Sequence, residues 1–314
     1  MKTILIPATS LKRLYKISPG IALAITLLGL TNIATAIPIV DLGSASGFAI
    51  LAGSKITDAG GSSTIANGNV GLYPTTGAAI GLTAGQLSGG TIYQAETSGA
   101  LLNTAQNDLT TAYNDAAGRP VTMDFGVVDN QLGGRTLFPG VYRFGLAATA
   151  NLIGTLTLDA NGDLNPVWIF QATSSLITAS GAPGAAGSNV AFLNGADSCD
   201  VFWQVGSSAT IGTYSNFAGS IMADQSIVLQ AYATLDGRAL ARIAAVTLDH
   251  NTISLPDCSS ETGGGGNTGG GGNTGGGNGG GTHAVPDAGS TLLLLGSGLM
   301  GLFAFGRKFF GIAT

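Results

Sequence analysis

The sequence VFWQVGSSATIGTYSNFA (residues 201–218) is followed by GSIMADQSIVLQAYATLD (219–236) and GRALARIAAVTLDHNTIS (237–254), three segments of 18 residues each. Aligned at this offset, they place apolar residues in shared columns. The columns are Trp203, Ile221 and Ala239; Val205, Ala223 and Ala241; and Phe217, Leu235 and Ile253. Apolar columns that recur at a fixed period predict the stacked coils of a β-solenoid, because each coil buries its inward side chains only against its neighbours.

Composition narrows the class of protein. The chain has 314 residues, of which 51 are glycine, and 9% of its residues are charged, with a net charge of −5. With 45% hydrophobic residues it is not a disordered polyelectrolyte. The Lys and Arg residues are few and scattered, which excludes the basic surface with which proteins bind nucleic acid. We expect one globular domain over residues 37–258, between two ends of different character.

The N-terminal end, residues 1–36, predicts a secretory signal peptide. Four Lys and Arg residues precede an apolar stretch at 21–30, and ATA at 34–36 provides a cleavage site of small residues. A permanent membrane anchor is the weaker alternative, because the apolar run is short.

A helix interrupts the strand patterns of the domain. Alternating apolar and small residues at 42–57 predict the first coil. At 95–117 the apolar residues recur at helical spacing in one stripe, which Gly118 ends. Strand patterns return at 136–193 and lead into the three regular coils. The solenoid is therefore discontinuous in sequence, and because the helix has an apolar stripe to bury, we expect it to lie along the solenoid's flank.

Two cysteines, Cys199 and Cys258, flank the regular coils. In an exported protein they favour a disulfide at the end of the solenoid. A loop of this length would constrain the unfolded chain by roughly 4 kcal/mol in the loop-entropy model. We expect no metal site, because the only histidines, His250 and His283, lack ligand spacing to the cysteines.

Groups that could perform catalysis are scarce, so we predict that the protein is not an enzyme and needs no cofactor. Asp249 and His250 are adjacent, and on a strand adjacent side chains point to opposite faces, which excludes a catalytic dyad. Asp159, Asn161 and Asp163 alternate as calcium ligands do. No downstream Glu completes an EF-hand loop, however, and a tight turn is the better interpretation.

The C-terminal end has two parts. Residues 259–284 are rich in Gly, Asn and Thr and predict a flexible linker. Residues 285–314 contain an apolar segment at 290–306 with Arg307 and Lys308 behind it. This segment is marginally long enough to span a bilayer, and the cations suit a cytoplasmic flank. A buried core helix is the alternative, but beyond a linker it has no core to join.

A flat face of small outward residues is the feature that could carry function. On the middle strand of each coil, two outward positions flank an inward apolar residue. They are occupied by Lys55 and Thr57, Thr149 and Asn151, Ser175 and Ile177, Ser208 and Thr210, Ser226 and Val228, and Ala245 and Thr247. Stacked coils place equivalent side chains about 4.7–4.9 Å apart, and β-branched Thr is ordered before it meets a partner. Such an array of hydroxyls and methyls suits ice as a planar, periodic ligand; the alternative is an ordinary solvated sheet of good strand residues.

Several motifs carry a resemblance to a known family. They are LGSASGFAIL (42–51), AYNDAAG (112–118), LFPGVY (137–142), VWIFQ (167–171), CDVFWQVGSSATIG (199–212), GRALAR (237–242) and AVTLDHNTI (245–253). Residues 38–258 thereby closely resemble the secreted ice-binding (antifreeze) proteins of cold-adapted bacteria, fungi and diatoms. The resemblance implies a mainly β fold, a right-handed, discontinuous β-solenoid of triangular coils with one long α-helix packed alongside.

The resemblance also implies ice binding through one flat face, which matches the twelve outward residues above. The match is firmest at Asn151, Thr210 and Thr247. The sequence departs from the family at Val228 and Ile177, and Lys55 interrupts the face at its edge. We predict adsorption to ice that inhibits its growth and recrystallisation. The alternative is a cell-surface adhesin that binds polysaccharide or another cell, which exposed aromatic residues on the face would favour.

The tail resembles a second known type of segment. Val285, Pro286 and Asp287, followed by an apolar stretch and two cations, resemble the bacterial C-terminal sorting signals that exosortase-type membrane enzymes process. The resemblance implies a processing enzyme and the membrane as partners, and a protein that is secreted or attached to the cell surface. We expect the protein to be a monomer.

Overall fold

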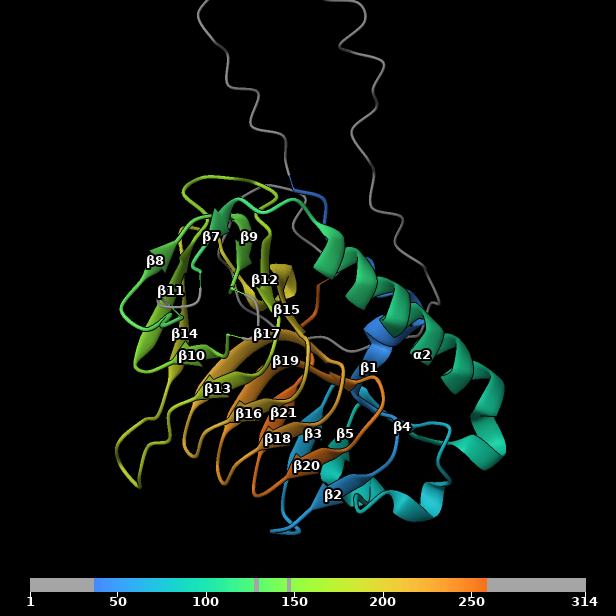
Figure 1. Ribbon diagram of the computed structural model, residues 1–314. Helices are drawn as coiled ribbons and strands as arrows, with labels where there is room; N and C mark the ends of the chain where they lie inside the picture. Colours follow the sequence, from blue (N-terminus) through green and yellow to red (C-terminus); the bar gives the residue numbers. More distant parts are fainter. Residues whose placement is uncertain (1–36, 127–129, 146–147, 259–314) are drawn as a thin grey trace, which may run out of the picture. The chain divides into compact units, whose positions relative to one another are not determined.

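The computed structural model describes residues 37–126, 130–145 and 148–258. The predicted signal peptide (1–36), linker (259–284) and sorting signal (285–314) lie outside the described residues. The solenoid and its helix belong to one compact unit that ends at Pro256. Figure 1 shows stacked parallel strands with one long helix beside them.

The smaller sheet forms one side of the solenoid. It has six parallel strands, each of three residues, from six coils. Their order is β10 (Ala150–Leu152), β13 (Leu176–Thr178), β16 (Ala209–Ile211), β18 (Ile227–Leu229), β20 (Val246–Leu248) and β2 (Ile56–Asp58).

A 15-stranded sheet forms the other two sides, because its longest strands turn a corner and serve both. The two shared strands are β17 (Asn216–Ala223) and β19 (Thr234–Ala241). On the side next to the helix lie β6 (Ile92–Gln94), β4 (Asn69–Leu72), β1 (Phe48–Ala52), β15 (Val201–Val205), β12 (Trp168–Ala172), β9 (Gly140–Arg143) and β7 (Met123–Asp124). On the third side lie β5 (Leu87–Ser88), β3 (Thr64–Ala66), β21 (Thr252–Ser254), β14 (Asn189–Leu193), β11 (Thr155–Asp159) and β8 (Thr136–Leu137).

Strand register confirms the predicted coils. Trp203 pairs with Ile221 and Ile221 with Ala239, and the same offset joins the other two predicted columns. The predicted discontinuity is also confirmed. The N-terminal coil stacks on the last regular coil, because β1 pairs with β19, β2 with β20 and β3 with β21. In Figure 1 the blue N-terminal strands accordingly lie next to the orange C-terminal ones.

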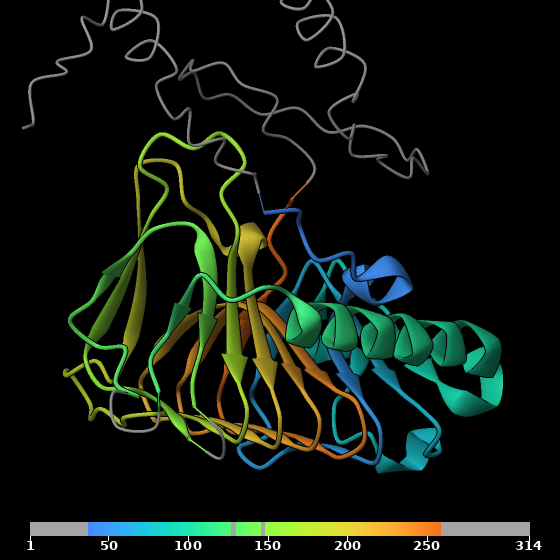
Figure 2. The same cartoon turned by 45° about the horizontal axis from the view of Figure 1, so that its top comes forward.

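The long helix α2 (Ala95–Gly118) ends one residue later than predicted and lies along the solenoid as expected. Figure 2 shows it beside the row of strands. Its buried residues are Leu102, Ala105, Leu109, Ala112 and Ala116. They pack against outward apolar residues of the neighbouring strands, among them Leu51, Leu240, Met222 and Phe202. The helix therefore removes a large part of one of the solenoid's three sides from solvent.

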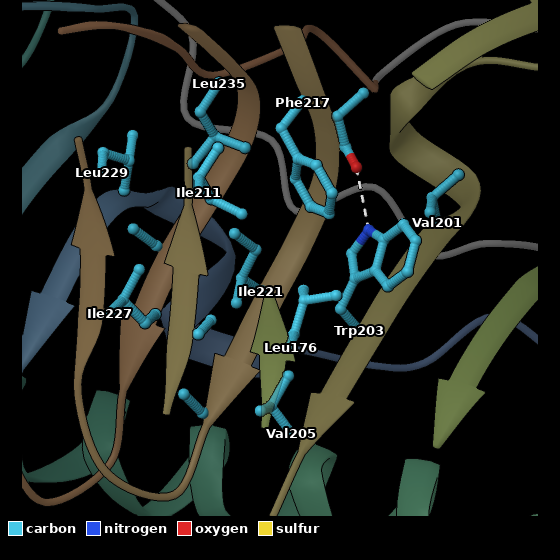
Figure 3. Close-up of a cluster of buried hydrophobic side chains, with 14 of the residues drawn as sticks. Leu176, Val201, Trp203, Val205, Ile211, Phe217, Ile221, Ile227, Leu229 and Leu235 are labelled. Atoms are coloured by element: carbon cyan, nitrogen blue, oxygen red, sulfur yellow. Dashed lines mark hydrogen bonds between the residues drawn. The ribbon is translucent and has the colours of Figure 1, made fainter. Parts of the chain in front are cut away.

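Aromatic rings stack inside the solenoid along the coil axis. The Phe170 and Trp203 rings lie 4.1 Å apart between centroids, and Trp203 and Phe217 lie 4.8 Å apart. The indole N–H of Trp203 donates to the carbonyl oxygen of Ala218 at 2.9 Å, so its one polar atom is satisfied (Figure 3). Both Cys199 and Cys258 are disulfide-bonded, as the sequence predicted.

Trp203→Ala tests the importance of this stack. Removing a fully buried ring that two other rings contact should lower the free energy of unfolding by about 3–5 kcal/mol. Denaturant unfolding of residues 37–258 measures the change. Leu164→Ala is the control, because that side chain is 83% exposed, and its effect should stay within about 0.5 kcal/mol. Equal effects of the two substitutions would contradict the assignment of the core.

Asp200 gives a pH-dependent prediction. It ends the short helix η4 (Ser198–Asp200), where burial, with the negative charges of Asp197 and Asp163, raises its pKa from 3.8 to about 7. Between these values the folded chain holds a proton that the unfolded chain has lost, so stability falls as the pH rises from about 4 to 7. Asp200→Asn should therefore raise the Tm at pH 8 and change it little at pH 4. Thermal unfolding checks this, and a gain of equal size at both pH values would contradict it.

Candidate functional site

Each strand of the six-stranded sheet buries its first residue and turns the residues on either side of it outward. The buried residues are Ala150, Leu176, Ala209, Ile227, Val246 and Ile56. Because successive side chains of a strand point to opposite faces, all twelve predicted residues lie on the outer surface of this one sheet. We call that surface the six-stranded face.

The twelve residues form two straight rows. One row consists of Asn151, Ile177, Thr210, Val228, Thr247 and Thr57, which are Cα partners in unbroken parallel register. The other row consists of Thr149, Ser175, Ser208, Ser226, Ala245 and Lys55. The carbonyl groups of the last five accept ladder hydrogen bonds of 2.8–3.2 Å from the neighbouring strand. Backbone hydrogen bonding therefore fixes the spacing of both rows.

The six-stranded face is nearly free of charge. Ten of the twelve residues are half-buried, and Ile177 and Lys55 are exposed. Lys55 lies next to β2, the last strand of the sheet, so the single charge is at one end. The hydroxyl groups of Thr57, Thr210 and Thr247 make no hydrogen bond to any described residue. They are therefore available to water, whereas the Ser208 hydroxyl accepts a 3.3 Å bond from the Ser226 backbone N–H.

Several known proteins are similar to this chain in sequence. Residues 50–254 match the Ice-binding-like family. An ice-binding protein of Nostoc sp. (strain HG1) is 36% identical over 301 residues, which cover 94% of this chain and 98% of that protein. The chain belongs to the ice-binding family. The family consists of ice-binding proteins rather than known enzymes.

Solved structures of the family share the fold. The crystal structure of an ice-binding protein from the Antarctic ascomycete Antarctomyces psychrotrophicus superposes with a TM-score of 0.59 at 36% identity, covering 70% of this chain and all of that one. A glycosylated ice-binding protein from an Arctic yeast gives a TM-score of 0.64 at 29% identity over 72% of this chain and 98% of that one. The fold implied by the resemblance is thus confirmed as a β-solenoid with one long helix.

The C-terminal end matches a second known segment. Residues 284–309 match the VPDSG-CTERM motif, in agreement with the predicted sorting signal at Val285, Pro286 and Asp287. No helix among the described residues is long and apolar enough to cross a membrane. The apolar segment at 290–306 lies outside the described residues.

A further column of aligned residues lies directly before the strands of the six-stranded face and was not predicted from the sequence. It lies where the chain enters each strand and consists of Ser174, Ser207, Gln225, Ala244 and Ser54. Backbone bonds from Ser207 to Ser174 (2.8 Å), from Gln225 to Ser207 (2.9 Å) and from Ser54 to Ala244 (3.2 Å) keep these residues aligned. The sequence held the signal, because each of these five residues directly precedes one of the twelve predicted residues.

The third side of the solenoid also carries a polar row, which was not predicted from the sequence. The row consists of Thr155, Asn189, Asn216, Thr234, Thr252 and Thr64, again in parallel register. Two of its contacts are internal: Thr234 donates to Asn216 at 2.9 Å, and Thr64 to Thr252 at 3.4 Å. The exposed Asp236 lies on the same side. This side is therefore more charged and more self-bonded than the six-stranded face.

At the corner between the six-stranded face and the third side, one prediction from the sequence is wrong. Asp249 and His250 do not point apart: His250 Nδ1 lies 2.6 Å from Asp249 Oδ1. The prediction assumed a strand, but His250 sits at a corner with φ of +55°. Tyr214 and Tyr232 occupy the same corner with φ of +55° and +60°, and the three rings stack at 5.0 and 4.9 Å. The period-18 repeat thus extends to a column of rings at this corner, of which Tyr232 is exposed.

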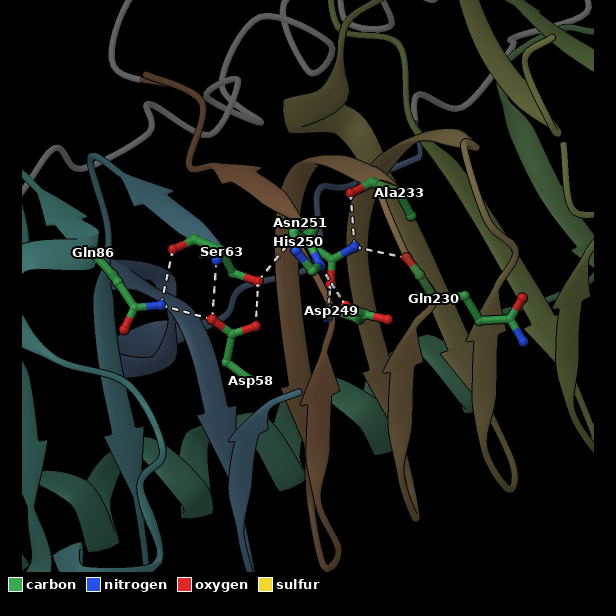
Figure 4. A network of polar contacts seen from close by, with 8 residues as sticks. All are labelled: Asp58, Ser63, Gln86, Gln230, Ala233, Asp249, His250 and Asn251. Carbon is green, nitrogen blue, oxygen red and sulfur yellow. Dashed lines mark hydrogen bonds and ion pairs between the residues drawn. The ribbon is translucent and has the colours of Figure 1, made fainter. Parts of the chain in front are cut away.

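Buried polar side chains hold the same corner from inside. Asn251 donates from Nδ2 to the carbonyl oxygens of Gln230 (2.8 Å) and Ala233 (3.0 Å), and its N–H donates to Ser63 Oγ at 2.9 Å (Figure 4). Ser63 in turn donates to Asp58 at 2.8 Å. Burial acts to raise the pKa of Asp58, but the hydrogen bonds from Ser63 and Gln86 lower it on balance. This network joins the N-terminal coil to the last regular coil.

The acidic residues considered for calcium form a turn. Asn161 and Gly162 have φ of +51° and +82°, and Asp159 Oδ1 accepts the Asn161 N–H at 2.8 Å, which confirms the turn interpretation. Within residues 37–126, 130–145 and 148–258, no group of three or more His, Cys, Asp or Glu side chains could hold a metal ion.

Proposed function

We propose that this protein adsorbs to ice through the six-stranded face and thereby inhibits ice growth and recrystallisation. The observation that carries the proposal is the pair of straight, nearly uncharged rows whose spacing the backbone ladder fixes. The spacing is that of neighbouring parallel strands, about 4.8 Å, and it repeats over six strands.

Rigidity supports this choice of face. Each strand is bonded on both sides or lies at the sheet end, and its first residue is anchored in the core. The β-branched side chains of Thr57, Thr210 and Thr247 have few rotamers, so little entropy is lost when they contact a crystal. Their free hydroxyl groups can hold water, while Val228 and Ile177 present methyl groups that leave water ordered beside them.

Adsorption at many points supplies the mechanism. Water held on the six-stranded face joins the crystal surface and keeps the protein there. Ice then grows only between adsorbed molecules, so its front becomes curved, and curvature lowers the local freezing point. The process makes and breaks no covalent bond, and it requires neither a catalytic group nor a cofactor.

The location of the protein is part of the proposal. A signal peptide at 1–36 would direct export, and the sorting signal at 285–314 would be processed by an exosortase-type enzyme at the membrane. The match of residues 284–309 to the VPDSG-CTERM motif supports this route. The Gly-rich stretch at 259–284 would then let a monomeric domain project from the cell surface or be released with it.

Thr210→Tyr combined with Thr247→Tyr tests the assigned face. Two bulky rings in one row should hold the face away from the crystal, so the concentration that inhibits recrystallisation should rise at least about tenfold, equivalent to ~1.4 kcal/mol. The measurement is an ice recrystallisation assay on purified residues 37–258. Thr234→Tyr is the matched control, since it places the same ring in the row of the third side and should leave the activity unchanged. Loss of activity in the control alone would move the ice site to the third side.

Pro286→Ala combined with Asp287→Ala tests the processing step. In a host with an exosortase-type enzyme, the full chain should lose its tail, whereas the variant should keep the apolar segment at 290–306. Mass spectrometry of the mature C-terminus measures this. Identical C-termini in the two proteins would exclude these residues as the signal.

A further inference from the structure

A cavity of about 540 Å³ lies where α2 ends, on the side of the solenoid that the helix covers. The last turn of α2, with Tyr113 and Gly118, forms one wall, and Arg119 continues it. The floor consists of Arg143, Gln171 and Gln204. The cavity is thus built by two parts of the fold, the helix end and three coils of the solenoid.

The floor residues are one column of the solenoid. Arg143 pairs with Gln171, and Gln171 with Gln204, on β9, β12 and β15. Further along, the same column contains Met222, which α2 covers. The column therefore changes from apolar to polar where the helix stops. Three polar groups at about 4.8 Å spacing extend along the cavity.

Two of the floor residues are buried amides. Gln171 and Gln204 are only 3% and 6% exposed. Gln171 Nε2 donates to the carbonyl oxygens of Ala116 (2.8 Å) and Arg119 (3.0 Å) and so caps the helix end, but its Oε1 accepts no bond from any described residue. Gln204 does not cap the helix; its side chain interacts with the hydroxyl group of Tyr113. The unbonded Oε1 of Gln171 is accessible and can therefore bind water or a ligand at the cavity.

The third floor residue, Arg143, is a cation whose hydrogen-bond donors are only partly used. Arg143 binds Asp124 Oδ2 through Nε (3.1 Å) and Nη2 (2.6 Å), and its Nη1 donates to no described residue. Arg119 is different, because Nε and Nη2 bind Asp115 and Nη1 binds the carbonyl oxygen of Pro38. Only Arg143 therefore offers an open edge to a ligand.

We propose that this cavity binds a carboxylated sugar, a uronic acid unit of an acidic polysaccharide. The open edge of Arg143 would pair with the carboxylate, and the amides of Gln171 and Gln204 would donate to and accept from ring hydroxyls. A bare anion is a poorer fit, because it would leave the amides of Gln171 and Gln204 unused. A neutral sugar would leave Arg143 unused. The site is on a different side from the six-stranded face, so ice and polysaccharide can be bound together.

An NMR titration of residues 37–258 tests the proposal. This region is used because a solved relative consists, over its whole chain, of the part that matches it. Glucuronate should shift the side-chain amide signals of Gln171 and Gln204, whereas glucose and acetate should bind at least about tenfold more weakly. Arg143→Gln should abolish the shifts while leaving the Tm and the ice recrystallisation activity unchanged.

Asp124→Asn separates a binding role from a structural one. Removing the carboxylate that competes for Arg143 should tighten glucuronate binding, whereas a merely structural ion pair would make this substitution as damaging as Arg143→Gln. The proposal is overturned by no shift with glucuronate, by equal binding of acetate or glucose, or by weaker binding in Asp124→Asn. None of these outcomes depends on whether the six-stranded face binds ice.

Discussion

Parallel hydrogen bonding between successive coils is the constraint on which this structure depends. Each coil donates backbone hydrogen bonds to the next coil and accepts them from it. A residue therefore lies directly over its counterpart, and equivalent residues form a column along the stack. Inside, the columns are the stacked rings of Phe170 and Trp203. Outside, they are the two rows of the six-stranded face and the stacked rings of Tyr214 and Tyr232. One ladder thus sets the core and the surface at the same spacing, and neither can change register without the other.

The predictable features were those that repeat. The period of 18 residues located the core columns and, with them, the outward rows, since inward and outward positions alternate on a strand. The helix was predictable because its apolar stripe has a different period. The prediction that failed concerns a corner of a coil. The error over Asp249 and His250 arose because the positive φ of His250 turns the two side chains together, and adjacent positions on a strand would not do this. The cavity at Gln204 could not be predicted either, because it depends on where α2 ends against coils more than 50 residues away.

Two sides of the solenoid carry rows of Thr and Asn, and physical chemistry separates them. On the third side, the Thr234 hydroxyl donates to Asn216 Oδ1, so this pair has less capacity to organise water. Asp236 adds a charge that holds its own hydration shell. On the six-stranded face, Thr210 and Thr247 have free hydroxyl groups, and the one cation lies at the end. Regular spacing alone therefore does not distinguish the two sides; the unbonded hydroxyls and low charge of the six-stranded face do.

The apolar members of the six-stranded face follow from the same reasoning. Val228 and Ile177 lie in register with Thr210 on either side, so the backbone imposes the same spacing on methyl groups as on hydroxyls. A methyl group neither donates nor accepts hydrogen bonds, and water beside it must bond to other water, as it does in ice. A hydroxyl group anchors that water at a fixed point. A row that alternates the two binds water at intervals and leaves it bonded to itself in between. Regular geometry, more than the number of threonines, should then limit adsorption, and within this row the exposed Ile177 side chain is the position that departs most from a plane of small side chains.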